Sequence, residues 1–366
     1  MSDKPYLLVA DCHFHQWSAF ATTDAAGLNS RLHIQLNELD RAADELKTRG
    51  GELMVIAGDL FHVRGSVDPE VFNPVHATLA RITAKGIIII AIPGNHDLKG
   101  KETSVLGNSF QTMGSIVTKG GQVRVITKSA HAWKREGQFI AMIPWCSTHD
   151  KLRAEVSLLM AGLKLEKIEA QDVDLIIHAG IDGVLEGVPA GGLSSYNVAE
   201  WGFKRVFAGH YHNHKVMELG DVVSIGATAH QTWSDIGSKA GFVFVYPDHI
   251  EWQASHAPEF VEITGEDDPD EIPLIVDGNY VRIRGMKLSD AEIKTFRTQL
   301  EEMGARGVSF QVAREAVVAR TGATAGKATT LDESVDKFID TLTEIDAPAV
   351  KAECTDVLSH IRSVAA

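Results

Sequence analysis

Three histidines stand at alternate positions in the stretch "VFAGHYHNHKV", where His210, His212 and His214 follow a short apolar run. Alternate side chains of an extended segment point to the same face, so these imidazoles can be directed at one point. A histidine-rich surface loop, or a half-buried strand with a polar face, would give the same local pattern. A metal site therefore requires further ligands from other parts of the chain.

Residues of ligand type also stand where other apolar runs end. "ADCHFHQ" contains Asp11 and His13, "GDLFH" contains Asp59, "PGNHD" contains Asn95, and "IIHAG" contains His178. Ligand sites of α/β domains collect at the carboxyl ends of strands, so we expect these side chains to meet. The candidate metal ligands are Asp11, His13, Asp59, Asn95, His178, His210 and His212.

Seven ligands are too many for one divalent ion and suit two ions that share a bridging ligand. Mixed oxygen and imidazole donors favour manganese, iron or zinc over calcium. Two ions about 3.5–4 Å apart can clamp a phosphate, lower the pKa of a water between them and stabilise in-line attack. Two carboxylates against two divalent cations leave the site net positive, which suits an anionic phosphodiester.

The elements that must position these residues alternate between apolar runs and amphipathic segments. The first strands are expected at 5–11, 51–59 and 87–93, with helices at 32–50 and 69–86 between them. This β-α-β-α-β order predicts a layered α/β domain with helices covering the sheet faces. Later apolar runs predict a second sheet or a sandwich, with strands expected at 138–145, 173–180, 205–212, 222–228 and 241–247.

Composition is that of a soluble globular protein, with 44% hydrophobic and 23% charged residues. The net charge of −14 argues against a globally basic surface for nucleic acid. Screening confines each charge to roughly 8–10 Å at physiological salt, so a local cationic site can still act on a phosphodiester. Three separated cysteines (Cys12, Cys146, Cys354) and a start without a secretory pattern predict a reducing, cytoplasmic location.

Four parts are expected along the chain. A catalytic domain over 1–264 ends at the acidic stretch "TGEDDPDEIP", and a small βαβ domain follows over 273–316. A flexible linker over 317–330 contains "RTGATAGKATT". The tail over 331–366 is expected to be helical, because apolar residues recur at helical spacing at Val335, Phe338, Ile339 and Leu342.

Five ordered motifs, DxH, GDxxH, GNHD, H and GHxH, resemble the signature of the calcineurin-like metallophosphoesterase superfamily. Within that superfamily, "GDLFH" and "GNHD" followed by "TSVLGNSFQTMG" are similar to the SbcD/Mre nuclease family. "HAGI" and "SIGATAHQTWSDIGSKAGFVFV" resemble the closing segments of that family, so the likeness covers roughly residues 6–245. It implies an α/β, two-sheet sandwich flanked by helices, with a small βαβ capping domain that binds DNA and a C-terminal helical tail.

The resemblance divides the candidate ligands between two ions that share Asp59. One ion would be held by Asp11, His13, Asp59 and His212. The other would be held by Asp59, Asn95, His178 and His210. Manganese is the expected metal, with magnesium, iron and zinc as alternatives.

Three further residues are expected to act in catalysis. By resemblance, His96 would face the phosphodiester and stabilise or protonate the leaving oxygen, and an imidazole near two cations suits that task near pH 7. His62 would help to orient the substrate strand, again by resemblance. Asp97 is expected to orient His96 as a hydrogen-bonding neighbour.

Other aromatic residues near the motifs are less specific. Phe14 and His15 stand where the family commonly has Leu-Gly, and we expect His15 to be a surface residue. His214 is expected to be exposed or to contact a ligand, without itself binding metal. Tryptophans near the motifs could stack on bases, although packing in the core or at the rim is the favoured interpretation for each. They are Trp17, Trp145 and Trp233.

The resemblance implies a manganese-dependent DNA exonuclease, with endonuclease activity as an option, that serves repair or recombination. Its expected partners are DNA and an SbcC/Rad-type ATPase, whose coiled-coil base the tail over 331–366 would bind. No membrane partner is expected, and homodimerisation is left open.

Two rival functions and one rival role for the tail are kept. A small-substrate phosphodiesterase or phosphatase would not need the cap and tail. A nonenzymatic DNA-end tether or ATPase regulator would have no use for the ligands and His96. The tail could also be an amphipathic helix that folds onto its own domain.

Overall fold

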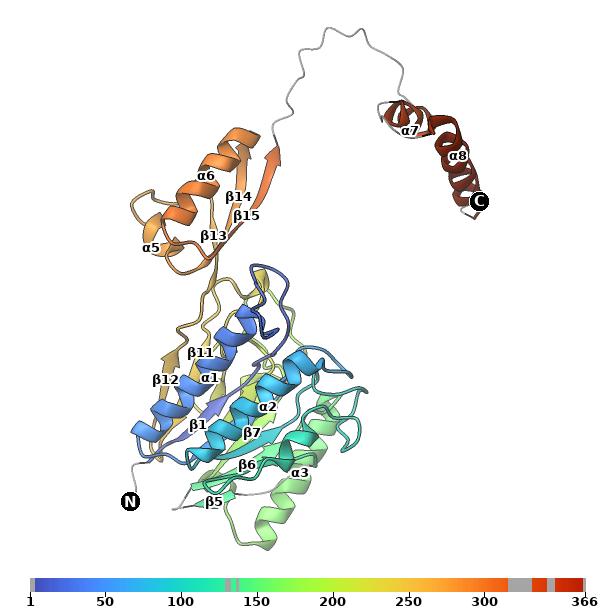
Figure 1. Ribbon diagram of the computed structural model, residues 1–366. Helices are drawn as coiled ribbons and strands as arrows, with labels where there is room; N and C mark the ends of the chain where they lie inside the picture. The colour runs from blue at the N-terminus through green and yellow to red at the C-terminus, as the bar shows by residue number, and fades with distance from the viewer. Residues whose placement is uncertain (1–3, 129–132, 136–137, 315–330, 341–345, 365–366) are drawn as a thin grey trace. The chain divides into compact units, whose positions relative to one another are not determined.

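The computed structural model describes residues 4–128, 133–135, 138–314, 331–340 and 346–364 of the chain. The chain divides into two compact units, Met1–Arg314 and Glu315–Ala366, and each is described by itself. Figure 1 shows the elements of both units. The linker expected over 317–330 lies outside the described residues.

The first sheet has the strand order β12-β11-β1-β2-β3-β4, and Figure 1 labels its strands β12, β11 and β1. Strands β1 to β4 run parallel, β11 pairs antiparallel with β1, and β12 pairs antiparallel with β11. The predicted strands at 5–11, 51–59 and 87–93 are confirmed. The strand expected at 241–247 is also present, but it pairs with β1 in the first sheet and not with the other later strands. The strands are β1 (Tyr6–Val9), β2 (Leu53–Ala57), β3 (Ile88–Ile92), β4 (Val123–Val125), β11 (Gly241–Val245) and β12 (Ile250–Ala254).

The second sheet has the order β5-β6-β7-β8-β10-β9, which confirms the prediction of a second sheet. Strands β6, β7, β8 and β10 run parallel, while β5 and β9 pair antiparallel at the two edges. The strands are β5 (Trp133–Arg135), β6 (Gln138–Ile143), β7 (Val173–His178), β8 (Arg205–Gly209), β9 (Lys215–Val216) and β10 (Val222–Ser224).

The two sheets pack face to face, and the alternation of side chains along each strand explains how. In β1, Leu8 points into a core shared with Ile176 and Phe207 of the second sheet. Its neighbours Leu7 and Val9 point the other way, into a core formed with the helices. Strands buried on both faces are apolar throughout, as the sequence shows.

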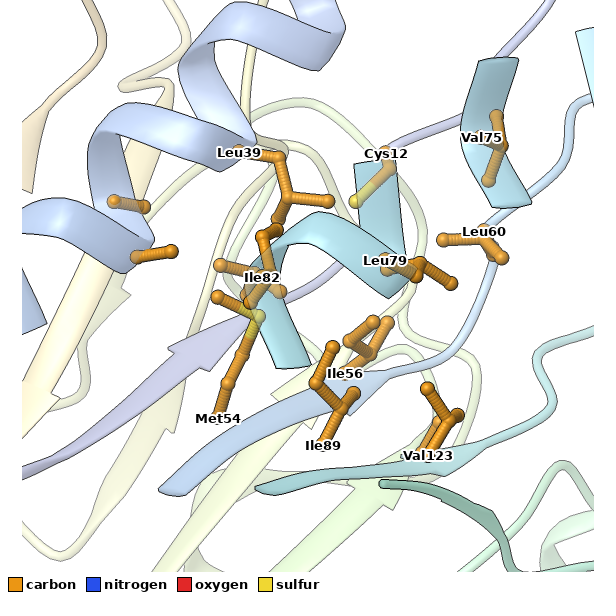
Figure 2. Packing of buried hydrophobic residues seen from close by; sticks show 14 of the residues in the cluster. Cys12, Leu39, Met54, Ile56, Leu60, Val75, Leu79, Ile82, Ile89 and Val123 are labelled. Atoms are coloured by element: carbon orange, nitrogen blue, oxygen red, sulfur yellow. The ribbon is translucent and has the colours of Figure 1, made fainter. Parts of the chain in front are cut away.

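Helices α1 (Ser30–Thr48) and α2 (Pro69–Ala84) cover the outer face of the first sheet. Figure 2 shows Leu39 of α1 and Leu79 and Ile82 of α2 close to Met54 and Ile56 of β2. Helix α3 (His149–Leu165) packs its apolar face on the second sheet. Short helical turns complete the sandwich: η1 (Gln111–Ser115), η2 (Ala170–Asp172), α4 (Ser195–Ala199) and η3 (Trp233–Asp235).

A third, three-stranded parallel sheet follows the sandwich, with the order β13-β14-β15. It begins at β13 (Phe260–Ile263), ahead of the βαβ unit expected from residue 273. Helix α6 begins with a capping box, in which Ser289 accepts from the backbone of Glu292 and Glu292 accepts from Ser289. The remaining elements are α5 (Ile272–Val276), β14 (Tyr280–Leu288), α6 (Asp290–Glu302) and β15 (Gly307–Arg314).

The described tail contains two helices, α7 (Leu331–Ile339) and α8 (Ala347–Val364). Of the apolar stripe expected there, Ile339 is buried, whereas Leu342 lies outside the described residues. An ion pair joins Lys351 of α8 to Asp340, with Nζ and Oδ1 2.7 Å apart. Among the described helices, none has the length and apolar content needed to cross a bilayer.

Candidate metal centre

The segments that follow β1, β2, β3, β7 and β8 meet at one edge of the sandwich. The Asp11 amide donates to the Gly58 carbonyl (3.1 Å), which joins the first two segments. The His210 amide donates to the carboxylate of Asp11 (2.9 Å), which joins the two sheets. The structure therefore brings together all seven side chains that the sequence nominates as metal ligands.

These side chains form two neighbouring groups. In the first group, ligand atoms of Asp11, His13 and His212 all lie within 4.8 Å of one another. The same holds in the second group, for the ligand atoms of Asp59, His178 and His210. We call them the first and second donor groups.

Asp59, a member of the second donor group, also reaches the first. Its Oδ2 atom is 3.5 Å from His13 Nε2 and 3.3 Å from His178 Nε2. Asn95 belongs on the side of the second group, because its Oδ1 lies 3.2 Å from His178 Nε2 and 3.0 Å from His210 Nδ1. This placement is the one that a bridging carboxylate and a one-sided amide ligand require.

The backbone at the site is unusual. Asp11, His13, Asp59 and His210 have positive φ angles of 50°, 45°, 51° and 104°. Among the described residues only Phe20 and Lys167 share this property without being glycine. Such conformations cost about 1–3 kcal/mol each and persist only where the surrounding structure enforces them, which is common at functional sites.

Two glycines make room for the side chains of candidate ligands. A Cβ atom on Gly58 would lie 2.1 Å from His178 Nδ1, and Gly58 also has a φ of +94°. A Cβ atom on Gly94 would lie 2.2 Å from Asp59 Oδ1. The glycines of the GD and GN motifs are thus required by the close approach of neighbouring ligand side chains.

Hydrogen bonds orient two of the imidazoles. His178 Nδ1 lies 2.7 Å from the carbonyl oxygen of Ala57, and His212 Nδ1 lies 2.7 Å from Asp235 Oδ1. With a proton on Nδ1, each ring donates to its oxygen partner and presents the lone pair of Nε2 to the site. This is the usual way in which a metal-binding histidine is fixed by a neighbour.

Sequence reasoning did not identify Asp235. Its carboxylate also accepts from the amides of Gln231 and Thr232, both at 2.8 Å, within a capping box that begins η3. Gln231 in turn donates from Nε2 to the Asp11 carbonyl (2.7 Å). The signal that could have found Asp235 is "TWSD", a capping pattern in which Asp stands three residues after Thr.

His96 lies beside the first donor group, with its ring 4.7 Å from that of His13. Its Nδ1 lies 2.6 Å from the His62 carbonyl, and its amide donates to Asp59 Oδ1 (2.8 Å). The His62 ring stacks on that of His96 at 5.5 Å, so the two imidazoles form one face beside the donor groups.

Asp97 does not have the expected role of orienting the His96 ring. Its buried carboxylate accepts from the amides of Gly94 (2.9 Å), Phe61 (3.1 Å) and Leu60 (3.3 Å). The partner of the His96 ring is the His62 carbonyl instead. Asp97 therefore joins the loops that carry Asn95 and Asp59, and it acts on the site through the backbone.

Burial and charge set the protonation of the cluster. Burial raises the pKa of the Asp11 carboxyl to about 7, against the opposing charge of His178. Burial would also raise the pKa of Asp59, but the imidazoles of His178 and His13 outweigh it and hold that pKa well below its usual range. Burial lowers the pKa of His210 to about 4, which leaves this ring neutral, the form that binds metal, at neutral pH.

The residues present fit two divalent cations. Carboxylate, amide and imidazole donors surround Asp59, and this oxygen and nitrogen set suits manganese, iron or zinc. Buried carboxylates need positive partners, and a pair of cations between the two groups would supply them. Cys12, between the candidate ligands Asp11 and His13 in the sequence, is buried in the apolar core with α1 and α2 (Figure 2).

The less specific aromatic residues have varied surroundings. His15 lies 5.1 Å from the His62 ring, and Trp17 is buried, with its Nε1 donating to Gln35 Oε1 (3.2 Å). Trp233 packs edge-on against Phe260 at 4.8 Å, as expected for a packing residue.

The expectation for His214 is corrected, since it is buried and stacks on Trp252 at 5.3 Å. Trp145 lies beside His210, with ring centroids 5.3 Å apart.

Comparison with curated proteins finds Exonuclease subunit 1 of Enterobacteria phage T4, which is 24% identical over 212 residues. The match covers 57% of each chain, so this chain spans a little over half of that relative's length. Among solved structures, TT1561 of Thermus thermophilus aligns at 10% identity and a TM-score of 0.44, over 69% of this chain and 98% of its own. A dimetal phosphatase from Danio rerio aligns at 11% identity and a TM-score of 0.41, over 67% and 93%.

The sequence pattern of the family described as calcineurin-like phosphoesterase matches residues 4–214. That range is more than half of the chain and contains all seven candidate ligands together with His96. Members of this family hydrolyse phosphoesters with a dimetal centre, and the two donor groups around Asp59 supply suitable ligands. The chain belongs to the calcineurin-like phosphoesterase family and is a metal-dependent phosphoester hydrolase.

Proposed function

We propose that this phosphoesterase is a DNA nuclease of the SbcD/Mre type, a manganese-dependent exonuclease with endonuclease activity as an option. The observation that carries the proposal is the joint presence of the two donor groups and of His96, whose ring lies beside that of His13 and whose ligand atom lies within 4.8 Å of those of His13 and His62. The match to a protein named Exonuclease subunit 1 of phage T4 supports a nuclease function.

The chain's own residues have separable tasks in this proposal. The bound cations would polarise the phosphoryl oxygens and lower the pKa of a water. Asp59 would hold the two donor groups together from its place between His13 and His178. Asp97 would keep the two ligand loops in register through their backbone amides.

His96 would donate the proton that the leaving oxygen needs. Its Nδ1 is engaged by the His62 carbonyl, which leaves Nε2 as the nitrogen that meets the substrate. His62, stacked on His96, would contact the same substrate strand. A general acid held in this way contributes about 10²–10⁴-fold to the rate.

The remaining parts of the chain complete the proposal. The sheet β13-β14-β15 with α6 would act as the DNA-binding cap, and the helices α7 and α8 would bind an SbcC/Rad-type ATPase in DNA repair or recombination. A cytoplasmic location belongs to the same proposal.

The test compares DNA with a small ester. End-labelled double-stranded and single-stranded DNA are digested with the purified chain and manganese, beside bis-p-nitrophenyl phosphate. We expect manganese-dependent shortening of DNA, absent in Asp59→Asn. Hydrolysis of the small ester without DNA cleavage would assign a small-substrate phosphodiesterase instead, and hydrolysis of neither substrate would assign a tether.

A further inference from the structure

A cavity of about 320 Å³ borders the second donor group. It lies between the turn after β6, the start of α3, the loop after β7 and the segment after β8, and His178 and His210 form part of its wall. Its volume falls at the lower end of the range for small-ligand pockets. A group in this cavity would lie next to two candidate ligands of the second donor group.

One wall of the cavity is the indole of Trp145, held in a defined place. Trp145 Nε1 donates to the Lys101 carbonyl (3.2 Å), and its amide donates to the Pro93 carbonyl (3.1 Å). Its own carbonyl accepts from Thr103 Oγ1 (3.0 Å). Since Pro93 directly precedes the loop with Asn95, the indole is fixed relative to a ligand of the second donor group.

A second aromatic ring, Tyr211, also lines the cavity. Its ring lies 5.2 Å from that of His210, while Trp145 lies 5.3 Å from the same imidazole. Tyr211 reaches this place because residue 180 is glycine, and a Cβ atom there would come within 2.8 Å of the Tyr211 ring. The absence of a side chain at Gly180 therefore leaves room for the Tyr211 ring.

A loop held by hydrogen bonds also lines the cavity. The Asp182 carboxylate accepts from the amides of Gly191 (2.6 Å) and Gly192 (3.0 Å). The side chains of His149 and Tyr211 make no hydrogen bond to any described residue, so their polar groups are available to a ligand. The cavity thus combines fixed aromatic faces with uncommitted hydrogen-bonding groups beside the site of phosphoester cleavage.

We propose that this cavity holds the base of the nucleotide at the cleaved bond, stacked on Trp145, an inference that rests on the proposed nuclease function. Every nucleobase has a flat aromatic face, so an indole can hold any of them without reading sequence. The base would fix the sugar and phosphate against the donor groups, and Trp145 and Tyr211 would be substrate-binding residues.

The experiment compares esters with and without a base, using the full chain saturated with manganese. The base-free probe is methyl p-nitrophenyl phosphate, chosen because its methyl group cannot stack. The base-bearing probes are the p-nitrophenyl esters of thymidine 5′-monophosphate and thymidine 3′-monophosphate, which place the base on either side of the phosphate. The measured quantity is the ratio of kcat/KM for the better thymidine ester to kcat/KM for the methyl ester.

In the unmodified chain we expect this ratio to be about ten or more, because stacking one base on an aromatic ring contributes an effect of that size. Trp145→Ala should lower the ratio by about tenfold, and Trp145→Phe should restore most of it. Gly180→Ala should also lower the ratio, because it displaces the Tyr211 ring without removing a polar group. Tyr196→Ala is the matched control, because Tyr196 is 55% exposed and bonds to Glu218, and its ratio should equal that of the unmodified chain.

Equal ratios in the unmodified chain, Trp145→Ala and Gly180→Ala would overturn the base pocket. Because Trp145 touches His210, metal content is measured in each variant. A loss of activity at the metal centre would affect both esters alike, so it cancels in the ratio. Cleavage of single-stranded DNA by the unmodified chain is measured in parallel. DNA cleavage with equal ratios rejects the base pocket and leaves the nuclease proposal standing, whereas absence of DNA cleavage rejects the nuclease proposal itself.

Discussion

At the scale of single residues, Asp59 faces both donor groups through one oxygen atom. Asp59→Asn should lose at least one of two metal ions and nearly all phosphodiesterase activity, because the neutral amide removes the charge that holds two cations together. Elemental analysis of the purified variant measures the metal content. Asp248→Asn, at an exposed carboxylate paired with His249, is the matched control. Two ions per chain in Asp59→Asn would contradict the bridging role.

A substitution at His96 gives the opposite test, in which the rate of cleavage falls while both metal ions stay bound. His96→Ala should retain both ions and bind DNA, yet lose roughly 10²–10⁴ in rate, as expected for a missing general acid. Single-turnover kinetics and metal analysis measure the two effects separately. If the metal content collapses, then His96 is a ligand and its proposed role is incorrect.

The sequence predicts which residues gather at the site better than it predicts their contacts. The seven candidate ligands meet because each stands at the end of an apolar strand, and strand ends of parallel sheets share an edge. The role of Asp97 could not be read in this way, because its partners Leu60 and Phe61 lie 37 and 36 positions away along the chain. Such contacts depend on loop conformations that no local pattern encodes.

At the scale of elements, the short turn η3 supports residues of the first donor group. Asp235 of η3 contacts His212, and Gln231 just before it contacts the Asp11 carbonyl. Asp235→Asn should weaken manganese binding by about 10–100-fold, the usual effect of losing a ligand's hydrogen-bonding carboxylate. Titration calorimetry with manganese measures this change.

Ser234→Ala is the control for that prediction, since Ser234 belongs to the same turn and bonds only within it, to Thr232. It should bind manganese as the unmodified chain does. Equal manganese affinity in Asp235→Asn and Ser234→Ala would show that Asp235 shapes the turn without affecting the metal.

The elements themselves were predictable where one physical signal dominates. Continuous apolar runs indicate the central strands, because a strand buried on both faces has no polar alternation to obscure it. The strand β13 was missed, since the burial of its Phe260 depends on aromatic contacts with Phe20 and Tyr280 from distant parts of the chain. The division of the tail into α7 and α8 was missed as well.

For the whole molecule, metal should contribute to stability. The donor groups place Asp11 and Asp59 in the interior, and bound cations offset that buried negative charge. A ligand at 100 times its dissociation constant stabilises a fold by about 2.7 kcal/mol, which corresponds to a shift in Tm of several degrees for a domain of this size. Chelation should lower Tm by that amount and manganese should restore it. An unchanged Tm on chelation, measured by differential scanning fluorimetry, would contradict this expectation.

The tail gives a second prediction at this scale. All candidate ligands and His96 lie in the unit Met1–Arg314, and the helices of the tail belong to the separate unit Glu315–Ala366. Deleting 331–366 should therefore preserve manganese-dependent cleavage of short DNA while abolishing co-purification with an ATPase partner. Thermal unfolding and basal cleavage are compared with those of the full chain. If the truncated chain unfolds or loses basal cleavage, the tail is part of the catalytic fold.

The positive φ angles at Asp11, His13, Asp59 and His210 have an evolutionary consequence. Glycine would adopt each of these backbone conformations without steric cost, so glycine at any of them would relieve strain and would also remove a candidate ligand. Selection for thermal stability alone would therefore favour glycine at these four positions, whereas selection for metal binding would favour the residues present. A lineage released from that selection should lose these four side chains before it loses the fold.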